Sequence, residues 1–482
     1  MVAIAEKGVF LSRSLAYIFA VSMLFLIISS SLLFQFGDKS LVPRSIYNII
    51  IVNNTPNSIQ IDETSDQFEP ESPPFALSSY NQSAFQSTGS CDQNQALVKV
   101  FMYDLPSSFH FGLLGWKEDQ NPNQIWPNVS NLSEIPKYPG GLNLQHSVEY
   151  WLTLDLLSSV SPSVSRPCTA IRVQNSSQAD IIFVPFFSSL SYNRHSKILG
   201  SEKDSMDNIL QESLVKYLEG RDEWRRLGGK DHLIMAHHPN SMLLARKHFG
   251  SSMLVLADFG RYPVQIANVD KDVIAPYKHV VRRLEANDSP SFEERRFLVF
   301  FQGAIRRKDG GIIRRKLYYL IKDEKDVHFT SGSASLGGIR TASRGMMSSK
   351  FCLTIAGDTP SSNRLFDAIA SHCVPVIISD DIELPFEDVL DYSKFAIFVQ
   401  SSDAIKKGYL IKLLRGIKRQ KWIQMWEILK KIAPHFEYQY PSQAGDAVDM
   451  IWHAVHRKIC LGHDNGVSHR DRYRKSHMFL NS

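Results

Sequence analysis

Residues 357–367 combine a turn with hydroxyl side chains at the point where a helix is expected to begin. Gly, Asp, Thr and Pro in succession favour a turn, with Thr359 as the helix cap and Pro360 at the first helical position. The backbone amides of Ser361 and Ser362 then have no partner within the helix. Because free amides at a helix start bind phosphate, this segment predicts a phosphate site.

The charged residues of this helix suit a nucleoside diphosphate. Arg364 and Asp367 are three residues apart and share one helical face. Arg364 is expected to contact the diphosphate, and Asp367 the ribose hydroxyls. Glu383, in the acidic loop after a strand expected at 374–378, is a further candidate for ribose or sugar hydroxyls. The competing interpretation is an ordinary βαβ unit with an internal arginine–aspartate pair.

A second loop offers similar chemistry. It lies between a strand expected at 296–301 and a helix expected at 312–321, and it contains Arg306, Arg307 and Lys308 together with glycines. Such loops bind phosphate, although basic loops are also common on protein surfaces. Cations and helix ends can stabilise a leaving diphosphate without a metal. We therefore predict no metal site, and we interpret the Asp-x-Asp at 270–272 as a solvated acidic turn.

Residues 349–390 resemble the core signature of the exostosin-type glycosyltransferases, glycosyltransferase family 47, in particular plant members similar to arabinan arabinosyltransferases. Further segments agree with the family in the same order, and the resemblance extends over about 98–459. These segments are VFMYDLP (100–106), QADIIFVPFFSSLS (178–191), GGKDHLIMAHHPN (228–240) and FFQGAIRRKDGGIIRRKL (300–317). The resemblance implies a UDP-sugar as co-substrate, no required cofactor and a cell-wall polysaccharide such as pectic arabinan as acceptor.

The family is regarded as inverting, which implies a single displacement assisted by a general base in the acceptor-side domain. His146 and His237 are the favoured candidates, because each is expected at a strand end or on the first helix. The alternatives are Asp104, Glu149, His238, Asp258 and, from the donor side, Glu383. A histidine in such a place is also often a purely structural group.

The five cysteines fit an oxidising compartment with few bridges. The resembled family often joins the two positions occupied here by Cys352 and Cys373, so a disulfide between them is predicted. Two buried free thiols are the alternative. Cys91 and Cys168 are a weaker candidate pair, which leaves Cys460 without a partner.

Strands alternate with helices from residue 97 onward, which predicts an α/β fold with mostly parallel sheets. Together with the resemblance, this implies a GT-B-like architecture, in which two Rossmann-like domains face a cleft. A polar break at 285–295 places the boundary between an acceptor domain at 96–290 and a nucleotide-sugar domain at 291–460. Residues 461–482 form a basic tail.

The N-terminal region has the pattern of a membrane anchor. Residues 15–36 are apolar enough to span a bilayer and lack the cleavage site of a signal peptide. We predict a cytosolic tail at 1–14, a transmembrane helix at 15–36 and a flexible lumenal stem at 37–95. Six glycosylation triplets follow the anchor and support a single-pass type II Golgi membrane protein: Asn53, Asn81, Asn128, Asn131, Asn175 and Asn287.

The net charge of +5 is mild and the basic residues are scattered, so nucleic acid is not expected as a partner. The expected partners are the nucleotide sugar, the polysaccharide acceptor, the membrane and a second glycosyltransferase chain in a homo- or heterodimer. Two competing interpretations are a non-catalytic scaffold subunit of a glycosyltransferase complex and a polysaccharide-binding module.

Overall fold

The computed structural model describes residues 91, 94–117, 125–198, 204–307, 311–332 and 335–461. The described part is an α/β structure with two sheets, and every strand pair in both sheets is parallel. The predicted α/β class is therefore confirmed. The predicted cytosolic tail and anchor, and most of the predicted stem and basic tail, lie outside the described residues. Among the helices that the structure does describe, none combines the length and apolar character needed to cross a bilayer.

The first sheet has six strands in the order β2-β1-β3-β4-β5-β6. Its central strands are buried on both faces, as their continuous runs of Val, Ile and Leu require. The strands are β1 (Val98–Met102), β2 (Ala170–Val173), β3 (Ile181–Val184), β4 (His232–Met235), β5 (Met253–Leu256) and β6 (Val273–Ile274). Helices α3 (Val148–Ser158), α4 (Ser188–His195), α5 (Met206–Glu219) and α6 (Asp222–Leu227) connect them.

The second sheet has five strands in the order β11-β10-β9-β7-β8. They are β7 (Phe297–Gln302), β8 (Val327–Thr330), β9 (Ser349–Ile355), β10 (Val374–Ile378) and β11 (Ile397–Phe398). Their helices are α7 (Ile312–Ile321), α8 (Leu336–Met347), α9 (Arg364–Ala370), α10 (Ser401–Ala404), α11 (Tyr409–Gly416) and α12 (Arg419–Ile432). The predicted bounds of α7 and β10 agree with the structure.

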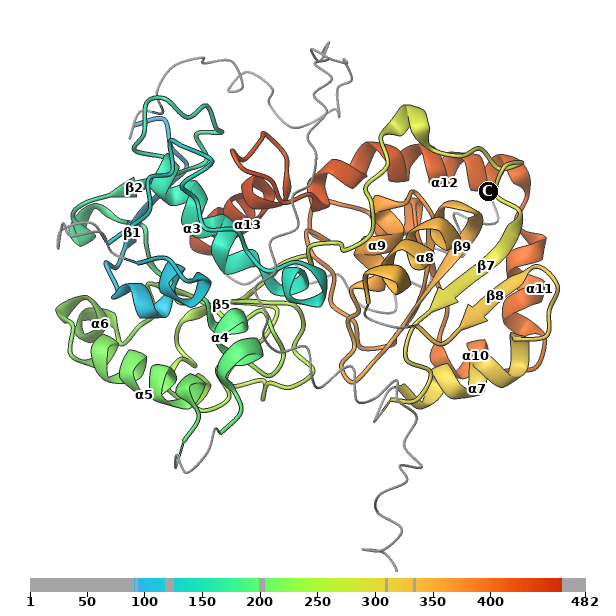
Figure 1. Cartoon of the computed structure of the whole chain (residues 1–482), viewed down its shortest axis with the longest axis horizontal. Coiled ribbons are helices and arrows are strands. Elements are labelled where there is room, and N and C mark those ends of the chain that lie inside the picture. Colours follow the sequence, from blue (N-terminus) through green and yellow to red (C-terminus); the bar gives the residue numbers. More distant parts are fainter. Residues whose placement is uncertain are drawn as a thin grey trace, which may run out of the picture. The chain divides into compact units, whose positions relative to one another are not determined.

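The C-terminal helix α13 (Ala447–Leu461) returns to the core of the first sheet, where Figure 1 shows it in red among the blue and green elements. The fully buried Trp452 contacts Phe183 of β3, and its Nε1 donates to Asp155 Oδ2 at 2.9 Å. Arg166 donates to the other oxygen of the same carboxylate at 2.8 Å. The predicted second domain extends to residue 460 and so includes α13, which these contacts join to the first sheet.

Two expectations from the sequence are corrected. The helix predicted from residue 359 begins only at Arg364, so neither Thr359 nor Pro360 starts it. The Asp-x-Asp segment is not a solvated turn, because Asp272 is buried and accepts hydrogen bonds from the amides of Leu254 at 2.7 Å and Asn268 at 2.8 Å. Asp272 therefore fixes the loop between β5 and β6.

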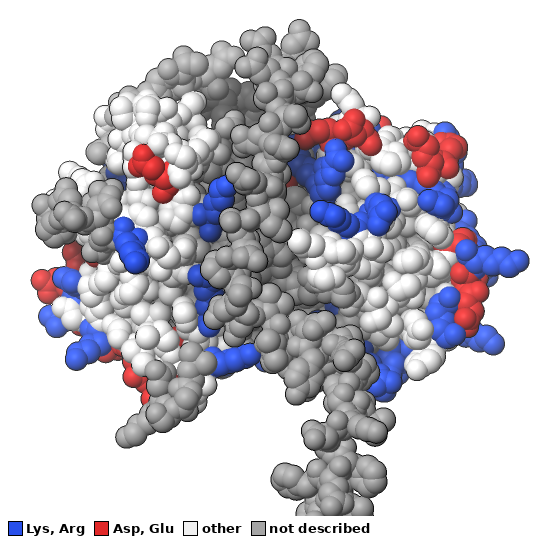
Figure 2. Space-filling model, viewed as in Figure 1, with Lys and Arg blue, Asp and Glu red and all other residues white. Residues whose placement is uncertain are grey.

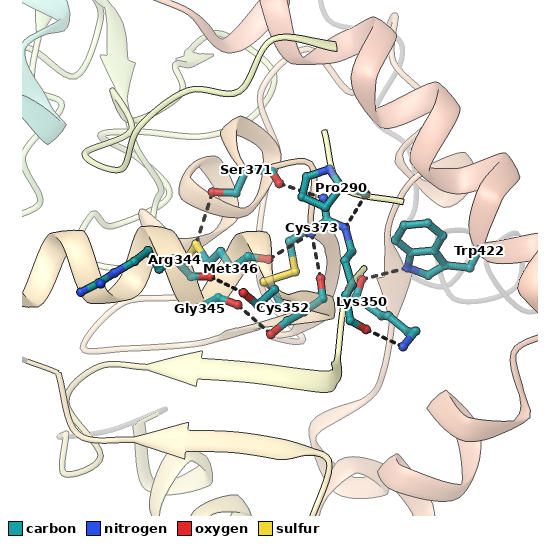
Figure 3. Close-up of a disulfide and its surroundings, with 12 residues drawn as sticks. Pro290, Arg344, Gly345, Met346, Lys350, Cys352, Ser371, Cys373 and Trp422 are labelled. Carbon is teal, nitrogen blue, oxygen red and sulfur yellow. Dashed lines mark hydrogen bonds between the residues drawn. A yellow bond between two sulfur atoms is a disulfide. The ribbon is translucent and has the colours of Figure 1, made fainter. Parts of the chain in front are cut away.

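The Cys352–Cys373 disulfide is present, as expected, and joins β9 to the residue before β10 (Figure 3). A second disulfide links Cys91 to Cys168, and Cys460 is free and exposed. The Cys352–Cys373 bridge closes the βαβ unit that carries α9. Near this bridge, Trp422 donates from Nε1 to the carbonyl of Lys350 at 2.9 Å.

A buried ion cluster connects the segment after β6 to the segment after α12. Glu437 accepts hydrogen bonds from Lys278 Nζ at 2.9 Å and from His279 Nε2 at 2.6 Å. Burial alone would raise the pKa of the Glu437 carboxyl, but His279 and Lys278 hold it at about 2. The other nitrogen of His279, Nδ1, donates to the carbonyl of Val281 at 2.8 Å.

Exposed ion pairs contribute less to stability than the buried cluster around Glu437. Over the second-sheet part, on the right in Figure 2, Lys and Arg side chains lie among Asp and Glu side chains. One exposed pair joins Arg419 to Glu293 at 2.5 Å. Such pairs contribute little to stability, so Glu293 provides a control for Glu437.

Removing the Cys352–Cys373 bridge by the double change Cys352→Ala and Cys373→Ala should lower the free energy of unfolding by about 2–4 kcal/mol, because the closed loop constrains the unfolded chain. Urea denaturation measures the loss. Cys460→Ser is the control and should leave the unfolding midpoint unchanged. Equal midpoints for the double variant and the wild type would contradict a structural role for the bridge.

Glu437→Gln should reduce the dependence of stability on acid. The folded pKa of Glu437, about 2, lies below its ordinary value of 4.5. The stabilisation is therefore fully present above that ordinary value and is lost as the pH falls towards 2. The stability difference between wild type and Glu437→Gln should narrow over this range, whereas Glu293→Gln should differ little from wild type throughout. A constant gap for Glu437→Gln would contradict the ion cluster.

Candidate active site

Two arginines share one aromatic ring at the carboxyl end of β7. The guanidinium carbons of Arg364 and Arg314 lie 5.6 and 5.5 Å from the centre of the Phe301 ring. Arg364, the first residue of α9, donates from Nε to the carbonyl of Gln302 at 2.8 Å. Arg314, on α7, donates to the carbonyls of Ala304, Ile355 and Ala356 at 3.3, 2.7 and 2.9 Å. Both side chains are thus held by backbone carbonyls, which carry no formal charge.

A third arginine adds to this cluster. Arg307, half-exposed, pairs with Asp358 at 2.7 Å. Burial first, and then the charges of Arg364 and Arg307, lower the pKa of Arg314 to about 9. Burial likewise lowers the pKa of Arg364. Because burial and neighbouring positive charge both disfavour these charged guanidinium groups, an anion bound here would stabilise them.

The other predicted donor residues fall at different places. Arg306 is exposed on the same loop, and Lys308 lies outside the described residues. Ser362 is buried and its hydroxyl accepts from the amide of Arg364 at 3.5 Å. Glu383 is half-buried in the loop after β10. Their donor-binding roles remain predictions. Arg314 was missed, because an arginine on an amphipathic helix is indistinguishable in sequence from a solvated one.

The loop before α9 reaches the first sheet through Ser361. The Ser361 hydroxyl donates to the carboxylate of Asp258, which follows β5, and accepts from Tyr277 at 2.7 Å. Pro360 also packs closely against Gly260, where an added Cβ would lie only 2.4 Å from Pro360 Cδ. This loop, defined here as residues 357–363, therefore connects the carboxyl ends of the two sheets.

Asp367 makes the second connection. Its Oδ1 accepts from the amides of Val280 and Val281 at 2.8 and 3.4 Å, and its Oδ2 accepts from Asn363 at 2.9 Å. Both carboxylate oxygens are thus engaged within the protein. The ribose contact predicted for Asp367 stays a prediction, and the structure gives the residue a role in holding α9.

The two histidines favoured as bases lie together. His146, the last residue of a 3₁₀ turn (Gly141–His146), and His237, two residues beyond β4, have Nδ1 atoms 2.9 Å apart. The His146 ring lies 4.8 Å from Tyr277, which binds Ser361 in the loop of the second sheet. Burial lowers the pKa of His237 to about 4 and that of His146 well below its ordinary value. Both rings are therefore neutral near pH 7.

Three of the alternative bases hold structural positions. Glu149 is fully buried, and its Oε1 accepts from the amides of Ser189 and Leu190, at the start of α4, at 3.1 and 3.3 Å. Burial raises its pKa to about 8, so it is mostly protonated at neutral pH. Asp104 pairs with Arg172 at 2.7 Å. Asp258 binds Ser361, as described above.

Gly303→Ala should weaken nucleotide binding without unfolding the chain. A Cβ at this position would lie 2.5 Å from Arg364 Nη2 and 2.6 Å from Nε, so the guanidinium would have to leave the Gln302 carbonyl. The displaced guanidinium should then lose one charge-assisted hydrogen bond to the diphosphate, which should raise the Kd for UDP by about tenfold or more. Gly416→Ala is the control, because no atom lies within 4 Å of its added Cβ. Calorimetric titration with UDP measures both variants, and equal affinities would contradict the site.

The chain is similar to known proteins over most of its length. The family described as the Exostosin GT47 domain matches residues 94–417. The probable arabinosyltransferase ARAD1 of Arabidopsis thaliana is 40% identical over 380 residues, covering 78% of this chain and 82% of that protein. A probable glucuronosyltransferase of Oryza sativa subsp. japonica is 25% identical over 386 residues, covering 76% and 82%.

The probable beta-1,4-xylosyltransferase IRX10L of Arabidopsis thaliana is 23% identical over 390 residues, covering 77% of this chain and 83% of that protein. These relatives are named for the transfer of different sugars. Similarity to them therefore shows the family and leaves the transferred sugar open. The match over most of the described residues, with the arginine cluster and the histidine pair inside it, shows that the chain belongs to the exostosin family of glycosyltransferases, GT47.

Proposed function

We propose that this glycosyltransferase transfers an arabinosyl residue from a UDP-sugar to a plant cell-wall polysaccharide such as pectic arabinan, with inversion at the anomeric carbon. The likeness to the probable arabinosyltransferase supports the choice of sugar. The observation that carries the proposal is the position of Arg364. Its guanidinium lies in a cluster of positive charge, on a helix that is joined to the histidine-bearing sheet.

The arrangement supports a direct displacement. The hydroxyl oxygen of the acceptor attacks the anomeric carbon while the bond from that carbon to the diphosphate oxygen breaks. The bonding electrons leave with the diphosphate, next to Arg364, Arg314 and Arg307. The hydroxyl proton passes to a base on the first sheet. Fixed cations at the leaving group can supply this stabilisation without a metal.

The two parallel sheets support a GT-B architecture, with the donor on the second sheet and the acceptor on the first. In this proposal, the acceptor domain is 96–290 and the donor domain 291–460, with α13 packed back on the acceptor domain. Ligands of open parallel sheets bind beyond the carboxyl ends of the strands, which is where the arginines and the histidines lie.

A Golgi location with a type II anchor at 15–36 belongs to the same proposal. The apolar segment and the glycosylation triplets support it. The four triplets within the described residues all begin with an exposed asparagine, as glycan attachment requires: Asn128, Asn131, Asn175 and Asn287. Asn53 and Asn81 lie outside the described residues.

A panel of UDP-sugars offered to the full-length chain, with and without EDTA, tests the proposal. We expect saturable binding and transfer for one sugar, UDP-arabinose, with no effect of EDTA. Arg364→Ala should raise the Kd for UDP by about tenfold or more, because a charge-assisted contact is lost. Arg225→Ala, which removes an exposed arginine from α6, should bind as the wild type does.

Binding of a different UDP-sugar would overturn the arabinosyl assignment and leave the reaction class intact. A folded chain that binds no UDP-sugar would favour the scaffold interpretation. That interpretation also predicts that Arg364→Ala restores polysaccharide synthesis in cells lacking the protein, whereas an enzyme with this substitution should not.

A further inference from the structure

We infer that Nε2 of His146 is the atom that removes the proton from the acceptor hydroxyl, and that His237 is the positioning residue that fixes His146 in the required tautomer. The inference rests on the proposed function, and it chooses between two histidines that sequence reasoning left equal. It follows from the hydrogen-bond partners of each ring nitrogen.

The hydrogen-bond partner of His237 Nε2 determines which nitrogen of this ring carries hydrogen. Its Nε2 lies 3.1 Å from the carbonyl oxygen of Ala275, just beyond β6. Because a carbonyl oxygen only accepts hydrogen bonds, Nε2 must carry hydrogen. The ring is buried and neutral at physiological pH, so Nδ1 of His237 carries the lone pair.

The lone pair on Nδ1 of His237 in turn determines which nitrogen of His146 carries hydrogen. Nδ1 of His146 lies 2.9 Å from Nδ1 of His237 and must therefore donate to it. A neutral His146 that carries hydrogen on Nδ1 has its lone pair on Nε2. The side-chain hydrogen bond described for His146 uses Nδ1, and the backbone of His237 also interacts with the His146 ring. The pair thus leaves Nε2 as the accepting nitrogen of a neutral His146.

His238 places a donor beside this acceptor. Its Nδ1 accepts from the amide of Asn240 at 3.1 Å, so a neutral ring carries its hydrogen on Nε2. The centres of the His146 and His238 rings lie 4.5 Å apart. The pair offers one acceptor and one donor, which suits a sugar hydroxyl because a hydroxyl can donate to one group and accept from another.

His146 is also placed towards the donor site. Its ring contacts Tyr277, and the Tyr277 hydroxyl donates to Ser361 in the loop of residues 357–363. Arg364 follows three residues after Ser361. A chain of direct contacts therefore runs from the proposed base to the cations of the leaving group.

The proton balance is simple. In the displacement, the acceptor O–H bond breaks and its proton forms a bond to Nε2 of His146. The oxygen keeps the electron pair and attacks the anomeric carbon. His146 becomes an imidazolium, still donating from Nδ1 to His237, and returns its proton to water after the product leaves.

The competing view is that the three histidines only fill a buried space. In that case any neutral side chain of similar size that preserves the packing should preserve activity. The base assignment predicts a dependence on one atom of each ring, which substitution can test.

Transfer kinetics of full-length variants give the test. His146→Gln should lower kcat by about 10²–10⁴-fold, the usual contribution of a general base, with the Kd for UDP unchanged. His237→Leu should lower kcat with little change in the donor KM, because His146 loses its acceptor. His237→Asn should recover most of that loss, since the asparagine Oδ1 can occupy the place of Nδ1. His248→Gln, an exposed histidine beside Glu219, is the control.

Binding of UDP, measured for each variant, shows that the chain is folded. If wild type transfers sugar while His146→Gln stays within about threefold of it, the base assignment fails and the proposed function stands. If His237→Asn is as slow as His237→Leu, the positioning role fails. If wild type transfers no sugar from any UDP-sugar, the proposed function itself fails.

Discussion

The buried carboxylate of Asp367 is the contact on which the arrangement of the site depends. It holds the backbone amides of Val280 and Val281, in the segment that leaves the first sheet, against helix α9 of the second. Buried amides without partners are costly, so this contact fixes α9 relative to the first sheet. Ser361 adds a second link through Asp258 and Tyr277. Arg364 begins the helix held in this way, and its position is thereby set.

The arginines that the second sheet contributes to the site are charged, whereas the histidines of the first sheet are uncharged. On the second sheet, arginines are held by neutral carbonyls and an aromatic ring, so their charge remains available for an anion. On the first sheet, burial keeps the imidazoles of His146 and His237 uncharged. The proposed displacement requires a neutral base and a cationic site for the leaving group, because a charged imidazole could not accept a proton.

Sequence reasoning found the elements whose pattern is local. The helix at 312–321 and the strand at 374–378 were placed correctly, because periodicity and β-branched runs define them. The start of α9 was missed, because Ser361 is drawn into contacts with Asp258 and Tyr277, more than 80 positions away, and these contacts override the local capping signals. Tyr277 and the return of α13 to the first sheet also depend on contacts between distant parts of the chain, whereas Arg314 was missed because its place on an amphipathic helix matches that of a solvated arginine. His146 and His237 were named separately, but their hydrogen bond joins residues 91 positions apart and follows only from the fold.

A crystal structure of the chain with bound UDP would locate the diphosphate relative to α9. We expect the diphosphate oxygens to lie within hydrogen-bonding distance of the Arg364 guanidinium, with Arg307 alongside. We also expect no metal ion to bridge these oxygens to the protein. UDP bound away from α9, or held through a metal by carboxylates of the first sheet, would overturn the proposed donor site.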